Sequence, residues 1–317
     1  MHSPTGLQFE LSAPTPLGEA RAIITEVAAS LRTLSIGGVH LTEPYADDVV
    51  PPFGDGIVLV PWPNRVEDGR WPLDGVEQQL DLTEPERGNA LHGLLRDRPY
   101  TVAERSASAV TLAATVFPTR GYPFQLDTTV RYELVDDGLR VTHGITNVGA
   151  RTAPVAVGTH PFLRLGDVPT DELVLTVAAG TRFETDARLN PVSENPVEGT
   201  SFDLRGGRPV AELHLDDAFG SVTPAGEVSR HRLGASDGRF VELWQDADFA
   251  FVQVFTTRIF PRDGGLGTPV LGTAVAVEPM TAPPNAFNSG QGLRWLAPGE
   301  TWSLSWGIRY SGKHEGE

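Results

Sequence analysis

Five short segments of the chain place hydrogen-bonding or titratable side chains beside proline, glycine or aromatic residues. Each interrupts an alternating pattern typical of strands, so each is expected at a strand end, where a rigid sheet holds the loops that carry function. Together they contain carboxylate, imidazole and guanidinium groups, which suit acid–base chemistry on a hydrogen-bonded small molecule. The segments are Pro61–Arg65, Ala90–Gly93, Gly158–Phe162, Leu215–Phe219 and Ala276–Met280.

Glu278 and His160 are the residues of these segments that suit proton transfer. Glu278 ends the apolar run Ala274–Val277, where a carboxylate is costly to bury unless it is paired or used. The ordinary pKa values of glutamate and histidine are about 4.3 and about 6.5, so at neutral pH one can be ionised while its environment keeps the other protonated. A structural reading stays open for each: an exposed carboxylate at a strand end, and a histidine bonded to a backbone carbonyl.

Arg65 and Asp216 are open to two readings as well. Arg65 is either a binding group or an ordinary surface arginine, and Asp216 is either a binding group or a turn former. None of these residues decides the function by itself.

Several other chemistries lack the residues they need. The chain has no cysteine, which removes disulfides, thiolate metal sites and a cysteine nucleophile. Its only lysine is Lys313, in the polar C-terminal tail, so a Schiff base or a phosphate-binding lysine has no anchor. The histidines show no metal-binding spacing such as H-x-H or H-E-x-x-H, and no nucleotide-binding glycine motif follows a strand. We therefore expect no metal and no cofactor.

The formal net charge is −16, from 25 basic and 41 acidic residues. Such a charge repels nucleic acid and anionic membranes, and it favours a neutral small molecule unless arginines cluster locally. No apolar run is long enough to span a membrane, and the N-terminal segment lacks the basic and apolar regions of a signal peptide. We expect a cytoplasmic protein that binds neither nucleic acid nor membrane and is a monomer or a weak homodimer.

The elements that hold these segments are predicted to be strands, because apolar residues recur with a period of two. Apolar and polar residues alternate in Phe124–Leu134, residues 138–147 form its predicted hairpin partner, and Thr301–Tyr310 repeats the pattern. Further strands are predicted within residues 109–117, 172–179, 239–245 and 249–255. We predict an all-β fold, a large antiparallel β-sandwich, because no βαβ alternation is visible. It is expected to be one domain over residues 1–317, with about five N-terminal and about six C-terminal residues frayed.

Short motifs from about residue 20 to about residue 310 resemble the aldose 1-epimerase (galactose mutarotase) family, in a bacterial subgroup of uncertain sugar preference. Each motif is weak alone, but six of them in the family order on an all-β background are specific. They are N-R at Asn64–Arg65, L-H-G at Leu91–Gly93, G-x-H-P-F at Gly158–Phe162, D-x-x-F at Asp216–Phe219, V-Q-V-F-T at Val252–Thr256 and E-P-M-T-x-P-P-x-A-F-N at Glu278–Asn288.

The resemblance implies a galactose mutarotase-like β-sandwich with a sugar bound in a cleft across one sheet. It implies interconversion of the α and β anomers of a free hexose by ring opening and reclosure. Glu278 would be the base that takes the proton of the anomeric hydroxyl, and His160 the acid that protonates the ring oxygen. The remaining matched positions would bind the sugar, and they are Asn64, Arg65, His92, Asp216 and Gln253.

Two positions depart from the family pattern. Leu94 stands where a second glycine is common, and Phe162 with Leu163 where a Tyr-Phe pair is common. Both departures are expected to line the sugar cleft, which puts galactose specificity in doubt.

Three other functions stay open. A hexose-6-phosphate 1-epimerase would need extra arginines at the phosphate, and Arg70 and Arg96 lie near the relevant loops. A non-catalytic sugar-binding protein would keep the cleft without the chemistry, although both Glu278 and His160 are present. A glycosidase would use Glu278 and Asp216 as a carboxylate pair.

Overall fold

Two large antiparallel sheets enclose the main hydrophobic core, so the predicted all-β sandwich is confirmed. The computed structural model describes residues 3–262 and 270–312. The ends that are expected to fray include residues 1–2 and 313–317, which lie outside the described residues, and so does Lys313. Among the helices described, none has the length and apolar character needed to cross a membrane.

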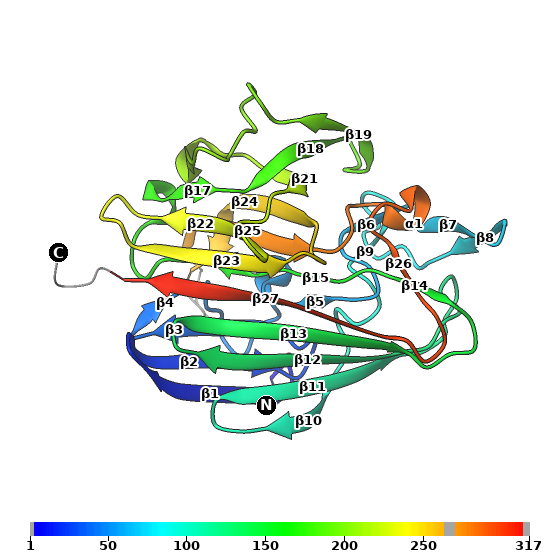
Figure 1. Ribbon diagram of the computed structural model, residues 1–317, viewed down its shortest axis with the longest axis horizontal. Coiled ribbons are helices and arrows are strands. Elements are labelled where there is room, and N and C mark those ends of the chain that lie inside the picture. Colours follow the sequence, from blue (N-terminus) through cyan, green and yellow to red (C-terminus); the bar gives the residue numbers. More distant parts are fainter. Residues whose placement is uncertain (1–2, 263–269, 313–317) are drawn as a thin grey trace.

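The nine-stranded sheet runs across the front of the molecule, from β17 near the top to β10 at the bottom (Figure 1). Its strands, in spatial order, are β10 (Thr101–Arg105), β11 (Ala109–Val116), β12 (Leu126–Val135), β13 (Gly138–Asn147), β27 (Thr301–Ser311), β23 (Phe240–Asp246), β22 (Val228–Gly234), β17 (Val174–Thr176) and β20 (Arg208–Pro209).

The eight-stranded sheet packs behind it and carries most of the segments singled out in the sequence. Its strands, in spatial order, are β19 (Pro191–Pro196), β18 (Ala179–Thr185), β21 (Asp216–Val222), β24 (Phe251–Pro261), β25 (Leu271–Met280), β15 (Gly158–Thr159) and β5 (Val58–Leu59), with β16 (Phe162–Leu163) also paired to β25.

Smaller elements complete the fold, and those that carry site residues gather at one end of the molecule beside α1 (Figure 1). They are the sheet of β1 (Gln8–Thr15), β2 (Gly18–Thr25), β3 (Leu31–Ile36) and β4 (Val39–His40); the pairs β6 (Arg65–Glu67) with β9 (Asn89–Leu91), β7 (Arg70–Leu73) with β8 (Val76–Gln79), and β14 (Ala153–Val155) with β26 (Arg294–Leu296); the helix α1 (Ala286–Ser289); and the 3-10 turns η1 (Pro52–Gly54), η2 (Thr170–Glu172) and η3 (Val210–Glu212).

The strands form where apolar and polar residues alternate. In β12 the buried and more exposed side chains alternate along the strand, and β13 pairs with it residue by residue from Gly138 to Asn147, as predicted. The predicted strand within residues 172–179 is wrong in part, because it is divided between η2, β17 and the start of β18. A period of two therefore located the hairpins well but did not detect breaks between short strands.

Strand β25 differs from the others because every residue from Thr273 to Met280 is buried. Val275 and Val277 point into the core between the two large sheets. Ala274 and Ala276 point to the other face, where Phe162 packs on them. Side chains on a strand alternate between faces, so Glu278 lies on the same face as Ala276, outside the sandwich core.

Candidate active site

The outer face of the eight-stranded sheet brings together side chains that are far apart in the sequence. Glu278 on β25 lies directly opposite Gln253 on the neighbouring strand β24. Asp216 begins β21, which pairs with β24 on its other side. His160 follows β15, which pairs with β25. These four residues line one cavity of about 510 Å³.

The small sheet of β6 and β9 supplies the opposite wall of this cavity. Arg65 begins β6 and pairs with Leu91 at the end of β9, so the segments containing Asn64 and His92 leave the sheet side by side. Asn64, Arg65 and His92 all line the cavity. The structure thus brings all seven predicted site residues to one place, although only two of the strands involved are adjacent in sequence.

Glu278 and His160 form a buried pair at the base of the cavity. The Nε2 atom of His160 lies 3.4 Å from Oε1 of Glu278, and the side chains are only 7% and 2% exposed. Burial raises the pKa of Glu278 well above its ordinary value, and the nearby Asp216 adds to the rise. Burial lowers the pKa of His160 to about 4. Each group is therefore held away from its charged form, and perturbed pKa values of this kind are concentrated at functional sites.

Three buried polar atoms on this face have no hydrogen-bond partner among the described residues. They are Oε2 of Glu278, Nδ1 of His160 and Oε1 of Gln253. Leaving a buried donor or acceptor unpaired costs about 1–3 kcal/mol, so native proteins rarely keep several together without a use. The concentration of such atoms in one cavity points to a polar ligand.

Arg65 is held in place by a residue that the sequence did not single out. Its Nε and Nη2 atoms each donate to one carboxylate oxygen of Glu84, at 2.9 Å in both cases. The same Nη2 lies 3.8 Å from Asp216, whose other oxygen accepts a 2.8 Å hydrogen bond from Gln253. This chain of contacts fixes the guanidinium, the carboxylate and the amide relative to one another.

His92 presents one ring nitrogen to the cavity as a donor. Its Nδ1 accepts a hydrogen bond of 3.2 Å from the backbone N–H of Asn64. Burial holds the pKa of His92 well below its ordinary value, so the ring is neutral and its proton is on Nε2. The ring stands edge-on to that of His160, with 5.5 Å between the centroids. Both His92 and Asn64 have left-handed backbone conformations, with φ of 63° and 54°, a conformation that these two residue types tolerate better than most.

The cavity has further lining residues that sequence reasoning missed. Arg87 and Glu86 lie in the loop before β9, and Phe53 belongs to η1. No motif marked these residues, and Glu84 was missed because its role depends on a long-range contact with Arg65. Of the two arginines considered for phosphate binding, Arg96 lines the cavity whereas Arg70 does not.

Comparison with known proteins decides the family. The sequence model that describes the aldose 1-epimerase family matches residues 38–309 of the chain. The chain belongs to the aldose 1-epimerase family. Its resemblance to this family, predicted from six short motifs, is confirmed.

Relatives of this aldose 1-epimerase family member include an uncharacterized protein of Escherichia coli, YihR, which is 33% identical over 293 residues, 92% of this chain and 90% of YihR. Among solved structures, an aldose epimerase homologue from C. elegans aligns with a TM-score of 0.82 at 18% identity, covering 96% of this chain and 99% of that one. A galactose 1-epimerase from Lactobacillus acidophilus aligns with a TM-score of 0.75 at 18% identity, covering 97% and 95%. At such identities the structural matches establish the fold.

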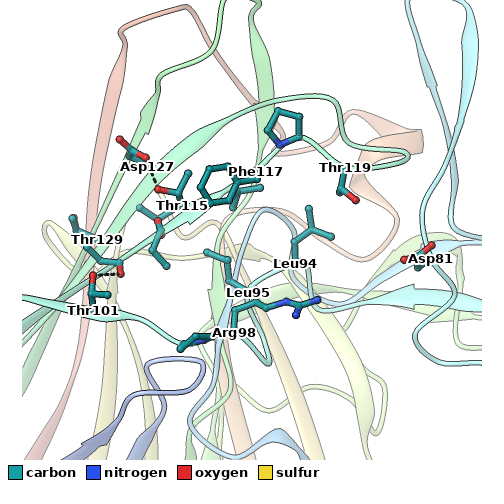
Figure 2. A pocket seen from close by; sticks show the side chains of 16 residues that line it. Asp81, Leu94, Leu95, Arg98, Thr101, Thr115, Phe117, Thr119, Asp127 and Thr129 are labelled. Atoms are coloured by element: carbon teal, nitrogen blue, oxygen red, sulfur yellow. Dashed lines mark hydrogen bonds between the residues drawn. The ribbon is translucent and has the colours of Figure 1, made fainter. Parts of the chain in front are cut away.

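A second, larger cavity of about 890 Å³ lies between β11, β12 and the loop that follows His92 (Figure 2). Leu94, Leu95 and Arg98 come from that loop, Phe117 directly follows β11, and Asp127 lies on β12. None of the seven predicted site residues lines it. The hydroxyl of Thr115 already donates to Asp127 at 2.7 Å there. The larger cavity is therefore not the one that gathers the predicted site residues.

The expectation that Leu94 and Phe162 line the cavity is wrong, whereas galactose specificity stays untested. Leu94 lines the second cavity and not the one that holds Glu278. Phe162 is fully buried beneath His160, with 5.4 Å between the ring centroids, and does not line the cavity either. The ring of Phe162 packs on Ala276 on the outer face of the sheet, where it is covered and does not reach the cavity.

Proposed function

We propose that the protein is an aldose 1-epimerase (a mutarotase) that interconverts the α and β anomers of a free hexose in this cavity. The observation that carries the proposal is the buried pair of His160 and Glu278, 3.4 Å apart, each with a further unpaired polar atom. Donors and acceptors on Arg65, His92 and Asp216 surround the pair, as binding a polyhydroxylated ring requires.

In the proposed reaction Glu278 takes the proton of the anomeric hydroxyl while His160 gives a proton to the ring oxygen. The bond between C1 and the ring oxygen then breaks, and the anomeric carbon becomes the carbonyl carbon of an open-chain aldehyde. Rotation about C1–C2 presents the other carbonyl face, and the two proton transfers run in reverse as the ring closes. No atom is gained or lost, and the pair ends each turnover as it began.

The pKa shifts of the pair favour the protonation state that follows ring opening over the one that precedes it. The pair carries one proton in total, either as carboxylate with imidazolium or as carboxylic acid with neutral imidazole. Ring opening converts the first form into the second, because Glu278 gains a proton and His160 loses one. Burial favours the neutral form of each group, so the site stabilises the state that accompanies the open-chain aldehyde. Positioned acid–base catalysis contributes a factor of about 10²–10⁴ per group.

The proposal is tested by polarimetry on freshly dissolved α anomers of glucose, galactose and other free hexoses. Acceleration of the approach to equilibrium at catalytic protein concentration supports the proposal. Failure to accelerate any hexose, with or without an anionic substituent, would contradict it. An aryl glycoside in the same panel checks for the glycosidase alternative through release of the aglycone.

Arg96 favours a second candidate, a hexose-6-phosphate 1-epimerase. Arg96 lines the cavity, and among the described residues no carboxylate forms an ion pair with it. Arg87, in contrast, is held by Glu84 at 2.9 Å. An unpaired guanidinium at the cavity wall would suit an anionic group on the sugar. Comparing glucose with glucose 6-phosphate and a sulfonated hexose, in the wild type and in Arg96→Gln, separates the candidates: only an anionic substrate should lose turnover in the variant.

Three predictions from the sequence have no test in the structure. The cytoplasmic location, the organisation as one domain over residues 1–317 and the monomeric or weakly dimeric state stay predictions.

A further inference from the structure

Phe53 has a backbone conformation that phenylalanine rarely adopts. Its φ and ψ are 54° and 22°, in the left-handed region, and the following Gly54 is left-handed as well, with φ of 76°. For a bulky side chain this region costs of order 1–3 kcal/mol, and such residues persist only where the surroundings enforce them, often at binding sites.

The surroundings that enforce this turn belong to the active site. Asp55, which is fully buried, accepts a 3.2 Å hydrogen bond on its Oδ1 from the backbone N–H of Phe162. Its backbone carbonyl accepts a 2.7 Å hydrogen bond from the hydroxyl of Ser30. The backbone N–H of Gly56 donates to the carbonyl of His160 at 2.8 Å. The strained turn is thus fastened to the segment that carries the catalytic imidazole.

The ring of Phe53 lies at the wall of the catalytic cavity and is only partly covered. The side chain is 41% exposed, and its ring centroid lies 5.9 Å from that of Phe255 and 6.1 Å from that of Phe260. Phe255 is the cross-strand partner of Asp216. The exposed part of the Phe53 ring therefore adjoins the polar groups that are proposed to hold sugar hydroxyls.

We propose that Phe53 is a sugar-binding residue whose ring packs against the apolar C–H face of a bound hexopyranose. A pyranose ring has hydroxyls around its rim and C–H groups on its faces. Asp216, Gln253 and His92 can bind the rim, but no other partly exposed phenylalanine, tyrosine or tryptophan lines the described part of the cavity apart from Phe255. Covering an apolar face with an aromatic ring removes both surfaces from water. The strained backbone is what places the ring there.

This inference rests on the proposed function, because it assumes that the cavity binds a sugar. Phe53→Gly is the decisive variant, because glycine accepts the left-handed conformation without cost while removing the ring. We expect KM to rise about tenfold with kcat nearly unchanged, which corresponds to about 1.4 kcal/mol of lost binding. The melting temperature is expected to stay the same or rise, because the backbone strain is relieved. Phe53→Tyr keeps the ring and should keep KM near that of the wild type.

Phe117→Ala is the matched control, because Phe117 is also an exposed phenylalanine, 67% exposed, but lines the second cavity (Figure 2). Its KM should not change. An unchanged KM in Phe53→Gly, with the wild type active, would overturn the inference and leave the proposed function standing. If the wild type turns over no sugar, calorimetric affinities for the same sugars give the test: a tenfold loss in Phe53→Gly supports the inference, and equal or absent binding overturns it.

Discussion

Buried polar groups in this protein fall into two kinds, and two histidines show the difference. His143, between the large sheets, is 1% exposed and accepts a 3.1 Å hydrogen bond from the indole N–H of Trp306. His160, on the outer face of the eight-stranded sheet, is 6% exposed, faces Glu278 and keeps one nitrogen unpaired. Burial lowers the pKa of both, to about 3 and about 4. Burial and a shifted pKa therefore do not distinguish the structural histidine from the one proposed to be catalytic, whereas an unpaired nitrogen on a ring beside a carboxylate does.

The largest effect is expected at the incompletely paired histidine. His160→Gln should lower the rate of anomer interconversion by about 10²–10⁴-fold, because the acid that protonates the ring oxygen is lost. Its effect on the free energy of unfolding should be small, because His160 leaves one nitrogen unpaired in the native state. Polarimetry and chemical denaturation measure the two quantities. A fall in stability without a fall in rate would place His160 with the structural histidines.

Glu84 is a fully paired group within the site, and its loss should affect stability more than chemistry. Glu84→Gln removes one charge of a pair whose side chains are 9% and 4% exposed. We expect the free energy of unfolding to fall by about 3 kcal/mol, at the lower end for breaking a buried ion pair, because the glutamine oxygen still accepts one hydrogen bond. KM should rise as Arg65 loses its fixed position, while kcat changes less.

The control for Glu84 is an exposed ion pair. Glu212, 56% exposed, contacts Arg208 at 3.0 Å, and Glu212→Gln should change the free energy of unfolding by less than about 1 kcal/mol. Equal losses in the two variants would show that the Glu84–Arg65 contact is not specially stabilising.

A further effect concerns pH and the hydrogen-bonded histidine of the core, His143. The pKa of His143 is about 3 in the folded state and about 6.5 in the unfolded state. Between these two pH values the unfolded chain therefore binds a proton on this histidine and the native state does not. His143 therefore contributes fully above pH 6.5, and its contribution is lost as the pH falls from 6.5 toward 3. The loss is about 1.4 kcal/mol per pH unit. In His143→Leu the free energy of unfolding should depend less steeply on pH in that window, by the slope that corresponds to about one proton. Urea denaturation between pH 7 and pH 4.5 measures this slope. An unchanged slope would contradict the assignment.

The sequence predicted the hairpins well, and the seven residues that it singled out line one cavity, but it did not predict how they are arranged there. Period-two patterning located β13 to the residue and β27 to within one residue, because alternating burial is a local property. The motifs identified the residues along the sequence but not which of them lie side by side. That depends on strand register, which places Gln253 opposite Glu278 and which local patterns do not encode.

The failures have the same origin. Leu94 directly follows one motif and Phe162 lies in another, yet neither side chain lines the cavity, because the side-chain position depends on the local strand and turn. Glu84 and Phe53 lie outside every motif, and their importance comes from an ion pair between the segment before β9 and the start of β6, and from a strained turn. Only the folded chain brings these features together.

The central claim is that Glu278 acts as the base of the proposed reaction, and Glu278→Gln tests it most directly. Glutamine keeps the shape of the side chain and can still contact a sugar hydroxyl, but it cannot take a proton. Polarimetry on the hexose that the wild type prefers should show the anomer interconversion rate reduced by at least about 10²-fold. Calorimetric binding of the same sugar should stay measurable. A rate equal to that of the wild type, with binding intact, would contradict the account.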